Sequence, residues 1–341
     1  MLSKKKGFRI LVVGLGSIGK RHLSIIRILR PDADIRVIRH KSCTEIPKFA
    51  NGCFDSFQEA VEFLPQVAVI ANPSPFHLSI SKILANIGCH LLIEKPLSNN
   101  ANDISDLIKI RDQNNLIAHV GYNLRRDSTL VRFKKEVVSG LVGRILSVRC
   151  EAGHYLPSWR PNSDYRLGVS ARADLGGGVL SELSHELDYL RWIFGEISSV
   201  SARLDKQSDL EVDVEDSAHF HLRLVSDSGN FVTASVNLDF IRHDRRRVCF
   251  AIGERGTLKW DGIKGCVELW KEESKNWETL YNFQHSRNDT YIQQWLDFLN
   301  CIDKDKNKIE LSSLEDGLAI MKVIDSIRES NSRNSLEILV D

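Results

Sequence analysis

Two patterns of apolar and polar residues divide the chain near residue 121. Before that point, short continuous apolar runs alternate with segments in which apolar residues recur at helical spacing. The runs predict strands at 8–13, 35–38, 67–71, 89–93 and 116–120, and the periodic segments predict a helix that runs through residue 29 and helices at 56–64, 77–87 and 102–113. Alternation of strand and helix predicts a parallel, doubly wound sheet.

After residue 121, strands follow one another with few helices between them. A helix is predicted at 128–139, strands at 145–152, 199–204, 217–226, 230–240, 247–252, 257–260, 267–270 and 277–281, and two closing helices at 290–301 and 313–329; residues 227–230 predict a hairpin turn. This pattern predicts a large antiparallel sheet with one face covered by helices. The free face would be covered by a second copy, as a homodimer or homotetramer through the C-terminal sheet.

A segment of unusual composition follows three glycines at 176–178. Read as one helix over 176–190 that continues to residue 194, it places Leu180, Leu183, Leu187, Leu190 and Phe194 on one side, and Ser181, Glu182, His185, Asp188, Tyr189 and Trp192 on the other. The second side carries carboxylates, an imidazole and a phenol. Taken alone, such a face is typical of a helix that meets water; with the motifs below, it predicts the wall of an active site.

A glycine-rich turn joins the first predicted strand to the first helix. Gly14, Gly16 and Gly19, with Ser17 and Ile18 between them, form a GxGxxG motif. The first glycine permits a tight turn, the second lets a pyrophosphate approach the backbone, and the third lets helix and strand pack closely. The phosphates would meet the free N–H groups of the helix. Residues 1–121 are therefore predicted to bind a dinucleotide.

The end of the second strand bears on the choice of cofactor. Arg39 and His40, followed by Lys41, stand where an NAD-binding domain usually has an acidic residue for the ribose 2′-hydroxyl. Basic residues suit a 2′-phosphate, so NADP is favoured. NAD remains open, through Asp32 or Asp34 or through backbone contacts.

Three more strand ends carry polar side chains. They are Asn72, Pro73 and His77; Glu94 and Lys95; and Asn123. Ligands of open parallel sheets bind beyond the carboxyl ends of the strands. These groups are therefore predicted to converge on the nicotinamide end of the cofactor.

Composition and charge narrow the class of protein. The net charge is +1, from 46 Lys plus Arg against 45 Asp plus Glu, which favours neither nucleic acid nor a membrane surface as a partner. No apolar run is long enough for a membrane span and the first residues lack a signal-peptide core, so we expect a cytoplasmic protein. The seven cysteines form no CxxC pair, which predicts reduced thiols and no structural metal.

Together, these motifs resemble the Gfo/Idh/MocA oxidoreductases: the glycine turn, Asn72-Pro73, Glu94-Lys95-Pro96 and the helix after three glycines, in this order. The resemblance implies a Rossmann domain, here 1–121, followed by an α/β domain, here 122–341, with a large, open, mostly antiparallel sheet for substrate binding and oligomerisation. It also implies Lys95 and His185 as the catalytic pair.

The chain departs from the family at one position. Many members have an Asp four residues before the catalytic His, where this chain has Ser181. Glu182, three residues before His185, would lie on the same helical face and replace that Asp.

An aromatic segment precedes the glycines and resembles members associated with bacterial surface-sugar metabolism. The predicted substrate-binding residues are Tyr155, Trp159, Arg160, Tyr165 and Arg166, together with Asn123 and Asp188. Aromatic rings suit the apolar face of a pyranose, and an arginine suits a carboxylate or phosphate.

The resulting hypothesis is reversible hydride transfer between NAD(P) and a secondary alcohol of a sugar, sugar acid or sugar nucleotide. His185 would take the hydroxyl proton and Lys95 would stabilise the developing alkoxide. Two alternatives remain: a non-catalytic nucleotide-sensing or scaffold protein of the same fold, and a reductase of a non-sugar carbonyl.

Overall fold

The computed structural model describes residues 7–40, 45–226, 229–303 and 311–340, and the chain divides into two compact units. The first unit contains Met1–Asn123 and Arg287–Leu318, and the second contains Leu124–Ser286 and Ala319–Asp341. The sequence pattern grouped residues 287–318 with the second domain, whereas this segment returns to the first unit. The assignment of 1–121 to nucleotide binding and of 122–341 to substrate binding stays a prediction.

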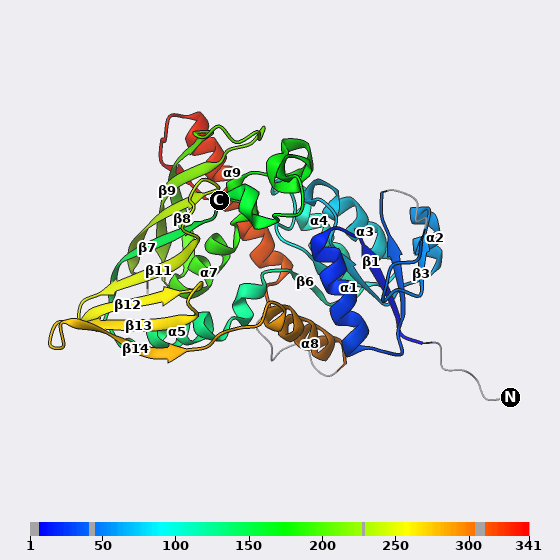
Figure 1. Ribbon diagram of the computed structural model, residues 1–341, viewed down its shortest axis with the longest axis horizontal. Helices are drawn as coiled ribbons and strands as arrows, with labels where there is room; N and C mark the ends of the chain where they lie inside the picture. Colours follow the sequence, from blue (N-terminus) through cyan, green and yellow to red (C-terminus); the bar gives the residue numbers. More distant parts are fainter. Residues whose placement is uncertain (1–6, 41–44, 227–228, 304–310, 341) are drawn as a thin grey trace. The chain divides into compact units, whose positions relative to one another are not determined.

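A six-stranded parallel sheet forms the centre of the first unit, in the order β3-β2-β1-β4-β5-β6 (Figure 1). Its strands are β1 (Arg9–Val13), β2 (Asp34–Ile38), β3 (Gly52–Phe54), β4 (Val67–Ile70), β5 (His90–Ile93) and β6 (Ala118–Val120). The predicted doubly wound sheet is confirmed. The prediction missed β3, because three residues on a sheet edge are too few to show a pattern.

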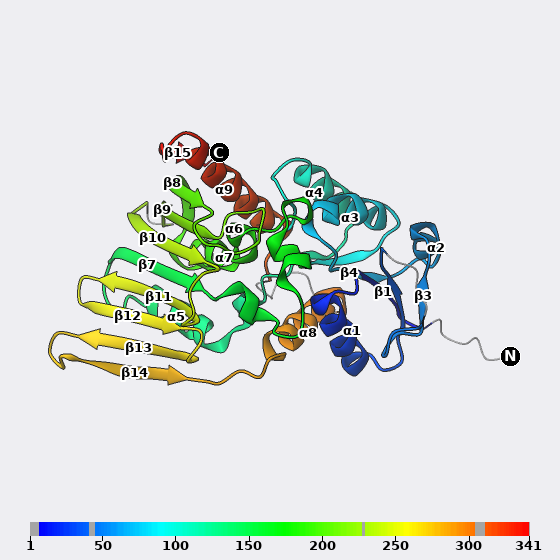
Figure 2. The same ribbon diagram turned by 45° about the horizontal axis from the view of Figure 1, so that its top comes forward.

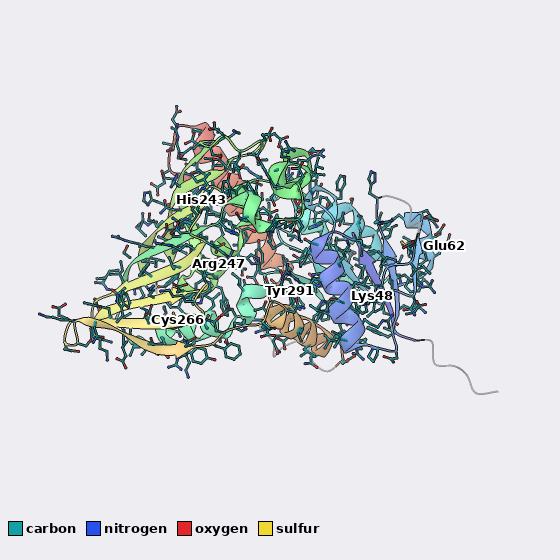
Figure 3. The ribbon with its side chains drawn as sticks, in the orientation of Figure 1. Lys48, Glu62, His243, Arg247, Cys266 and Tyr291 are labelled. Carbon is teal, nitrogen blue, oxygen red and sulfur yellow. The ribbon has the colours of Figure 1, made fainter. Side chains whose placement is uncertain are left out.

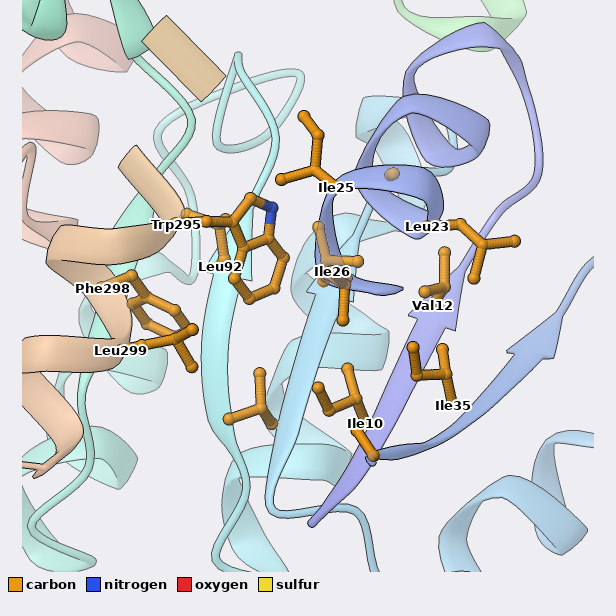
Figure 4. Packing of buried hydrophobic residues seen from close by; sticks show 14 of the residues in the cluster. Ile10, Val12, Leu23, Ile25, Ile26, Ile35, Leu92, Trp295, Phe298 and Leu299 are labelled. Carbon is orange, nitrogen blue, oxygen red and sulfur yellow. The ribbon is translucent and has the colours of Figure 1, made fainter. Parts of the chain in front are cut away.

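Helices of the first unit pack on this sheet. They are α1 (Ser17–Leu29), α2 (Phe57–Glu62), α3 (His77–Asn86), α4 (Ile104–Gln113) and α8 (Asp289–Asp303). Figure 4 shows the core between the sheet and helices α1 and α8, where Trp295 and Phe298 lie beside side chains such as Ile26 and Leu92. The fully buried Trp295 and Phe298 explain why α8 belongs to this unit.

A nine-stranded sheet forms the second unit, in the order β14-β13-β12-β11-β7-β10-β9-β8-β15 (Figure 2). Its strands are β7 (Ile145–Gly153), β8 (Glu196–Asp205), β9 (Ser217–Val225), β10 (Phe231–Asp239), β11 (Arg246–Gly253), β12 (Gly256–Asp261), β13 (Cys266–Lys271), β14 (Asn276–Asn282) and β15 (Ile338–Leu339). Only the pair β7 and β10 is parallel among the paired strands of this sheet in the described ranges. The predicted mostly antiparallel sheet is confirmed.

The second unit's helices include α5 (Ser128–Val138), α6 (Val179–Glu182) and α7 (His185–Phe194), and α9 (Leu314–Ser332) continues into it. The side chain of Asp127 begins α5 by accepting the N–H groups of Thr129 and Leu130, as an N-cap does. Along β9, apolar side chains are buried, whereas His219, His221 and Arg223 alternate with them and are exposed. The second unit therefore presents solvent-accessible polar positions on one face of this strand.

Five cysteines, Cys89, Cys150, Cys249, Cys266 and Cys301, are free and buried. Cys53 is disulfide-bonded, so the prediction of reduced thiols is wrong there. Disulfides join residues brought together by folding, which the spacing along the chain did not reveal. Lys41, Cys43 and the first two residues of the turn predicted at 227–230 lie outside the described residues.

None of the helices described is both long enough and apolar enough to cross a membrane. The cytoplasmic location stays a prediction. In the same described ranges, no group of three or more His, Cys, Asp or Glu side chains is arranged to hold a metal ion.

Candidate functional site

The glycine turn lies at the carboxyl end of β1, and its three glycines have different surroundings. Gly14 has a φ of +89°, and a Cβ there would come within 2.7 Å of the backbone nitrogen of Asn72. A Cβ on Gly19 would lie 2.1 Å from the carbonyl oxygen of Gly14. At Gly16 a Cβ would meet nothing within 4 Å. The first and third glycines thus allow close packing, and the second leaves the backbone open.

Helix α1 begins beside this open backbone. Its N-cap is Gly16, no side chain caps it, and its first turn, which starts with Ser17 and Ile18, contains no acidic residue. The free N–H groups and the positive end of the helix dipole therefore favour an anion. Together with the open side of Gly16, this arrangement fits the pyrophosphate of a dinucleotide.

At the end of β2, Arg39 is half-buried and His40 is exposed. The two carboxylates considered for NAD lie elsewhere. Asp34 is the first residue of β2, pairs in register with Arg9 at the start of β1, and forms an ion pair with Arg36. The glycine turn follows the carboxyl end of β1, whereas Asp34 pairs with the first residue of that strand. Asp32 and Asp34 therefore lie at the amino ends of the strands, opposite the turn.

His77 connects two of the predicted strand ends. Its Nε2 lies 2.7 Å from the carbonyl oxygen of Asn72, and its Nδ1 lies 3.1 Å from that of Pro96. The ring is buried, and burial lowers the pKa of His77 despite these hydrogen bonds and the nearby charge of Glu94. The His77 ring therefore lies between the loops after β4 and β5, with a backbone carbonyl oxygen beside each ring nitrogen, and a neutral ring can donate to only one of the two oxygens. The buried Oδ1 of Asn72, next to Pro73, has no hydrogen-bond partner within the described part of the chain.

The segment after β5 holds Glu94 and Lys95. Glu94 is buried and accepts a hydrogen bond from His22 Nε2 at 2.7 Å. Its other oxygen lies 3.3 Å from the backbone nitrogen of Lys95, whose side chain is half-buried. Asn123, after β6, is buried and donates to the Thr290 hydroxyl at 2.7 Å. In the first unit, the carboxyl edges of β4, β5 and β6 thus bring the predicted groups together.

In the second unit, the residues after the three glycines form two helices. Helix α6 ends at Glu182 and α7 begins at His185, because Leu183 has φ −100° and ψ 26° and interrupts the helix. The prediction of one helix over 176–190 is therefore wrong. The helical spacing that placed Glu182 and His185 on one face does not apply, although both are half-buried.

Residues predicted on the polar face are also more buried than expected. Ser181, Asp188 and Tyr189 are 3%, 1% and 0% exposed. Asp188 accepts two hydrogen bonds from Arg125, at 2.7 and 3.0 Å, and this guanidinium is 5% exposed. The carboxylate of Asp188 is engaged with Arg125 in the core, and the contact between Asp188 and a substrate stays a prediction.

A second buried ion pair also holds the first turn of α7. Glu186 is fully buried and its Oε1 lies 2.7 Å from Nε of Arg247 on β11; Figure 3 labels Arg247. Two successive acidic positions of α7 thus bind arginines from other elements. Of the polar residues predicted on this helix, His185 and Trp192 retain partial exposure.

Glu215 is a residue that the sequence did not single out. Its Oε1 accepts the N–H of Leu180 in the first turn of α6, and a Cβ on Gly178 would lie 2.3 Å from the same oxygen. Burial raises the pKa of Glu215 despite the hydrogen bond from Leu180. No local pattern predicts this contact, because the two residues are far apart in the sequence.

The aromatic segment lines an open cavity of about 280 Å³. Trp159, Arg160 and Tyr165 line it, together with the buried Leu156 and Ser170 among others. Trp159 stacks on His154 with ring centroids 6.1 Å apart. The cavity is close to the lower end of the sizes that bind small ligands.

The other two predicted substrate residues are engaged elsewhere. Arg166 is held by Asp164 and Glu211, each at 2.8 Å. Tyr155 packs on His243, which Figure 3 labels, with ring centroids 4.3 Å apart. Of the two arginines, only Arg160 lines the cavity near Trp159.

Comparison with known proteins identifies relatives for both units. The model "Oxidoreductase family, NAD-binding Rossmann fold" matches residues 8–122, and "GFO/IDH/MocA C-terminal domain" matches residues 130–259. Together they cover more than two thirds of the chain.

Individual relatives agree with these matches. Levoglucosan dehydrogenase of Pseudarthrobacter phenanthrenivorans is 31% identical over 140 residues, which span 40% of this chain and only 35% of that protein. Myo-inositol 2-dehydrogenase of Thermotoga maritima is 25% identical over 303 residues, 85% of this chain and 87% of that protein. A solved levoglucosan dehydrogenase in complex with NADH has the same fold, with a TM-score of 0.81 and 21% identity over 98% of this chain and 99% of that one.

Proposed function

Because the chain belongs to the Gfo/Idh/MocA family of NAD-binding oxidoreductases, we propose that it transfers a hydride between a nicotinamide cofactor and a secondary alcohol or ketone of a carbohydrate. The observation that carries the proposal is the glycine turn, where the open side of Gly16 meets an uncapped helix N-terminus. The relatives are dehydrogenases of an anhydrosugar and a cyclitol, which supports a sugar, sugar acid or sugar nucleotide as substrate.

The residues that would hold the cofactor come from the first unit. The turn from Gly14 to Gly19 would bind the pyrophosphate, and the unpartnered Oδ1 of Asn72 would accept a hydrogen bond. When bound, the nicotinamide supplies the site that accepts or donates the hydride. Arg39 and His40 would bind a 2′-phosphate, so we propose NADP ahead of NAD.

Lys95 and His185 would serve the reacting alcohol. His185 is the first residue of α7 and is half-buried, and an imidazole is a common proton acceptor in catalysis. In the direction of oxidation, His185 takes the hydroxyl proton. The Lys95 ammonium stabilises negative charge that develops on the substrate oxygen. Glu182 would orient His185.

The remaining predicted residues divide into two roles. Trp159, Arg160 and Tyr165 would bind substrate at the cavity, with the ring of Trp159 against the sugar and Arg160 on a carboxylate or phosphate. Asp188 and Asn123 would position neighbouring groups, because each is buried and already bonded within the protein. We also propose a homodimer or homotetramer through the nine-stranded sheet.

The test is an assay of turnover. Purified protein is mixed with NADP or NAD and with levoglucosan, myo-inositol, D-xylose or D-glucuronate, or with NADPH or NADH and an aromatic ketone, and the absorbance of the reduced nicotinamide is followed. Lys95→Ala and His185→Ala should each lower turnover by about 100-fold or more and retain nucleotide binding. Lys82→Ala, which removes an exposed ion pair with Asp106, is the control and should keep full turnover.

Other outcomes point to other functions. Turnover near the wild-type value in both variants would refute the catalytic pair. Nucleotide binding without turnover on any compound would indicate a sensing protein, and turnover on the aromatic ketone alone would indicate a reductase of non-sugar carbonyls.

The cofactor preference has its own test. Arg39→Ala should raise the KM for NADP by about 10-fold and leave the KM for NAD nearly unchanged, since only NADP carries the 2′-phosphate. A wild-type protein that uses NAD more efficiently than NADP would overturn this preference.

A further inference from the structure

A buried chain of hydrogen bonds runs from α8 to the Glu94-Lys95 segment in the first unit. Trp295 Nε1 donates to His22 Nδ1 at 2.7 Å, and His22 Nε2 lies 2.7 Å from Glu94 Oε1. Trp295 and His22 are fully buried, and Glu94 is 7% exposed. Figure 4 shows Trp295 projecting from α8 into the core. Buried side chains that are far apart in the sequence are thus bonded directly to each other.

This chain determines which ring nitrogen of His22 carries the proton. An indole nitrogen can only donate, so Nδ1 of His22 must accept and is unprotonated. The ring is therefore neutral, and its single proton is on Nε2 and is donated to Glu94. In the opposite tautomer, the Nδ1 proton would face the Trp295 N–H, and Nε2 would face a carboxylate oxygen as a second acceptor.

The geometry around Glu94 leaves its carboxylate little freedom. One oxygen is bonded to His22, and the other lies 3.3 Å from the backbone nitrogen of Lys95. A Cβ on Gly121 would come within 3.1 Å of Glu94 Oε1 and Cδ, so only glycine leaves ordinary room there. The His22 ring is also flanked edge-on by Tyr291 and Trp295 of α8, each with centroids 5.8 Å away.

We infer that Trp295 and His22 are positioning residues for Lys95, which act through the carboxylate of Glu94. The inference rests on the proposed function, in which Lys95 is catalytic. Trp295 selects the tautomer of His22, the N–H of His22 holds Glu94, and Glu94 holds the peptide at which Lys95 begins. Loss of the indole N–H removes this selection while an aromatic ring still fills the core.

The direct test is Trp295→Phe, with Trp260→Phe as the matched control. Trp260 is equally buried and its indole donates to the Thr129 hydroxyl at 2.8 Å, in the second unit. Both variants lose one buried indole hydrogen bond, so a purely structural effect should be similar in the two. Turnover is measured with the substrate of the panel above that the wild type uses fastest, at saturating cofactor and well below the unfolding temperature.

We expect Trp295→Phe to lower kcat by about 10- to 100-fold, as small displacements of a catalytic group do. The cofactor Kd, measured by protein fluorescence, should stay close to that of the wild type. Trp260→Phe should retain its kcat. His22→Gln keeps an N–H that reaches Glu94 and should retain a higher kcat than His22→Leu. This comparison tests the positioning role even if Trp295→Phe does not fold.

A second readout does not depend on activity. In protein labelled with ¹⁵N-histidine, the ring resonances of His22, assigned by their absence in His22→Gln, should show the Nε2–H tautomer alone. In Trp295→Phe, where the indole N–H no longer excludes a proton from Nδ1, the Nδ1 resonance should move away from that of an unprotonated nitrogen. A single Nε2–H tautomer in that variant would overturn the inference.

The kinetic outcomes separate this inference from the proposed function. If Lys95→Ala loses turnover but Trp295→Phe keeps the wild-type kcat, the positioning role is refuted and the proposed function stands. Equal losses in Trp295→Phe and Trp260→Phe would also refute it. Full turnover in Lys95→Ala would instead refute the catalytic role of Lys95 that the proposed function assigns and on which this inference rests.

Discussion

Substitution of Asp188 by asparagine tests whether this residue stabilises the core or binds substrate. The change removes the negative charge and keeps the shape of the side chain. Arg125 would then be a buried cation without its bidentate partner. The sequence suggested contact with a sugar, whereas the structure buries Asp188 against Arg125.

The expected loss of unfolding free energy in Asp188→Asn follows from the burial of the ion pair. The two side chains are 5% and 1% exposed, so water screens the pair little, and two hydrogen bonds of 2.7 and 3.0 Å are affected. Removal of one partner of a buried ion pair costs about 3–5 kcal/mol. For a unit of this size, that corresponds to a fall of about 6–20 °C in the unfolding temperature.

Thermal unfolding by calorimetry measures the effect, with Asp174→Asn as the control. Asp174 pairs with Arg172 at 2.6 Å, but these side chains are 58% and 44% exposed, so its loss should leave the unfolding temperature nearly unchanged. The double variant Arg125→Met with Asp188→Leu should recover much of the stability, because it leaves no buried charge.

The reasoning is refuted if Asp188→Asn unfolds at the wild-type temperature. If the same variant also raised the KM for the substrate without a change in stability, direct binding of the substrate would be the better explanation.

Two further predictions concern the first unit. Gly16→Ala should leave the unfolding temperature nearly unchanged, because its Cβ meets nothing within 4 Å, but it should weaken nucleotide binding by about 10-fold or more. Gly19→Ala should instead lower the unfolding temperature, because its Cβ would lie 2.1 Å from the carbonyl oxygen of Gly14. Calorimetry and nucleotide titration of the pair check this, and equal stability of both variants would contradict it. Burial lowers the pKa of His77 below 6.5, so between these values the unfolded chain binds a proton that the folded chain does not. The stability from the neutral ring is present above pH 6.5 and is lost as the pH falls, so the difference in unfolding free energy between wild type and His77→Gln should shrink from about pH 7.5 to about pH 5. Denaturant unfolding at several pH values measures it, and a constant difference would show that His77 does not titrate as described.

Local patterns were sufficient for much of the fold. Long apolar runs and helical periodicity predicted the strands and helices of both sheets, with small differences at their ends. Gly14, Gly16 and Gly19 were interpretable because each acts on backbone close to it in the chain. The three-residue strand β3 was missed because its partner β2, not its own composition, makes it a strand.

Polar residues were harder to interpret, since the partner of a side chain decides what it does. Arg160 and Arg166 are similar in sequence terms, but Asp164 and Glu211 occupy Arg166 and leave Arg160 at the cavity. The break after Glu182 changed which side chains of the glycine-rich segment are buried.

The sequence by itself determined the alternation of elements, the glycine turn and the residue types available for catalysis. Those features depend on backbone geometry and on neighbours a few residues away. Only the tertiary structure decided that α8 joins the first unit, that Trp295 donates a hydrogen bond to His22, and that Asp188 forms an ion pair with Arg125. Each depends on side chains that are distant in the sequence and meet only when apolar surface is buried, and no local pattern records which of them will meet.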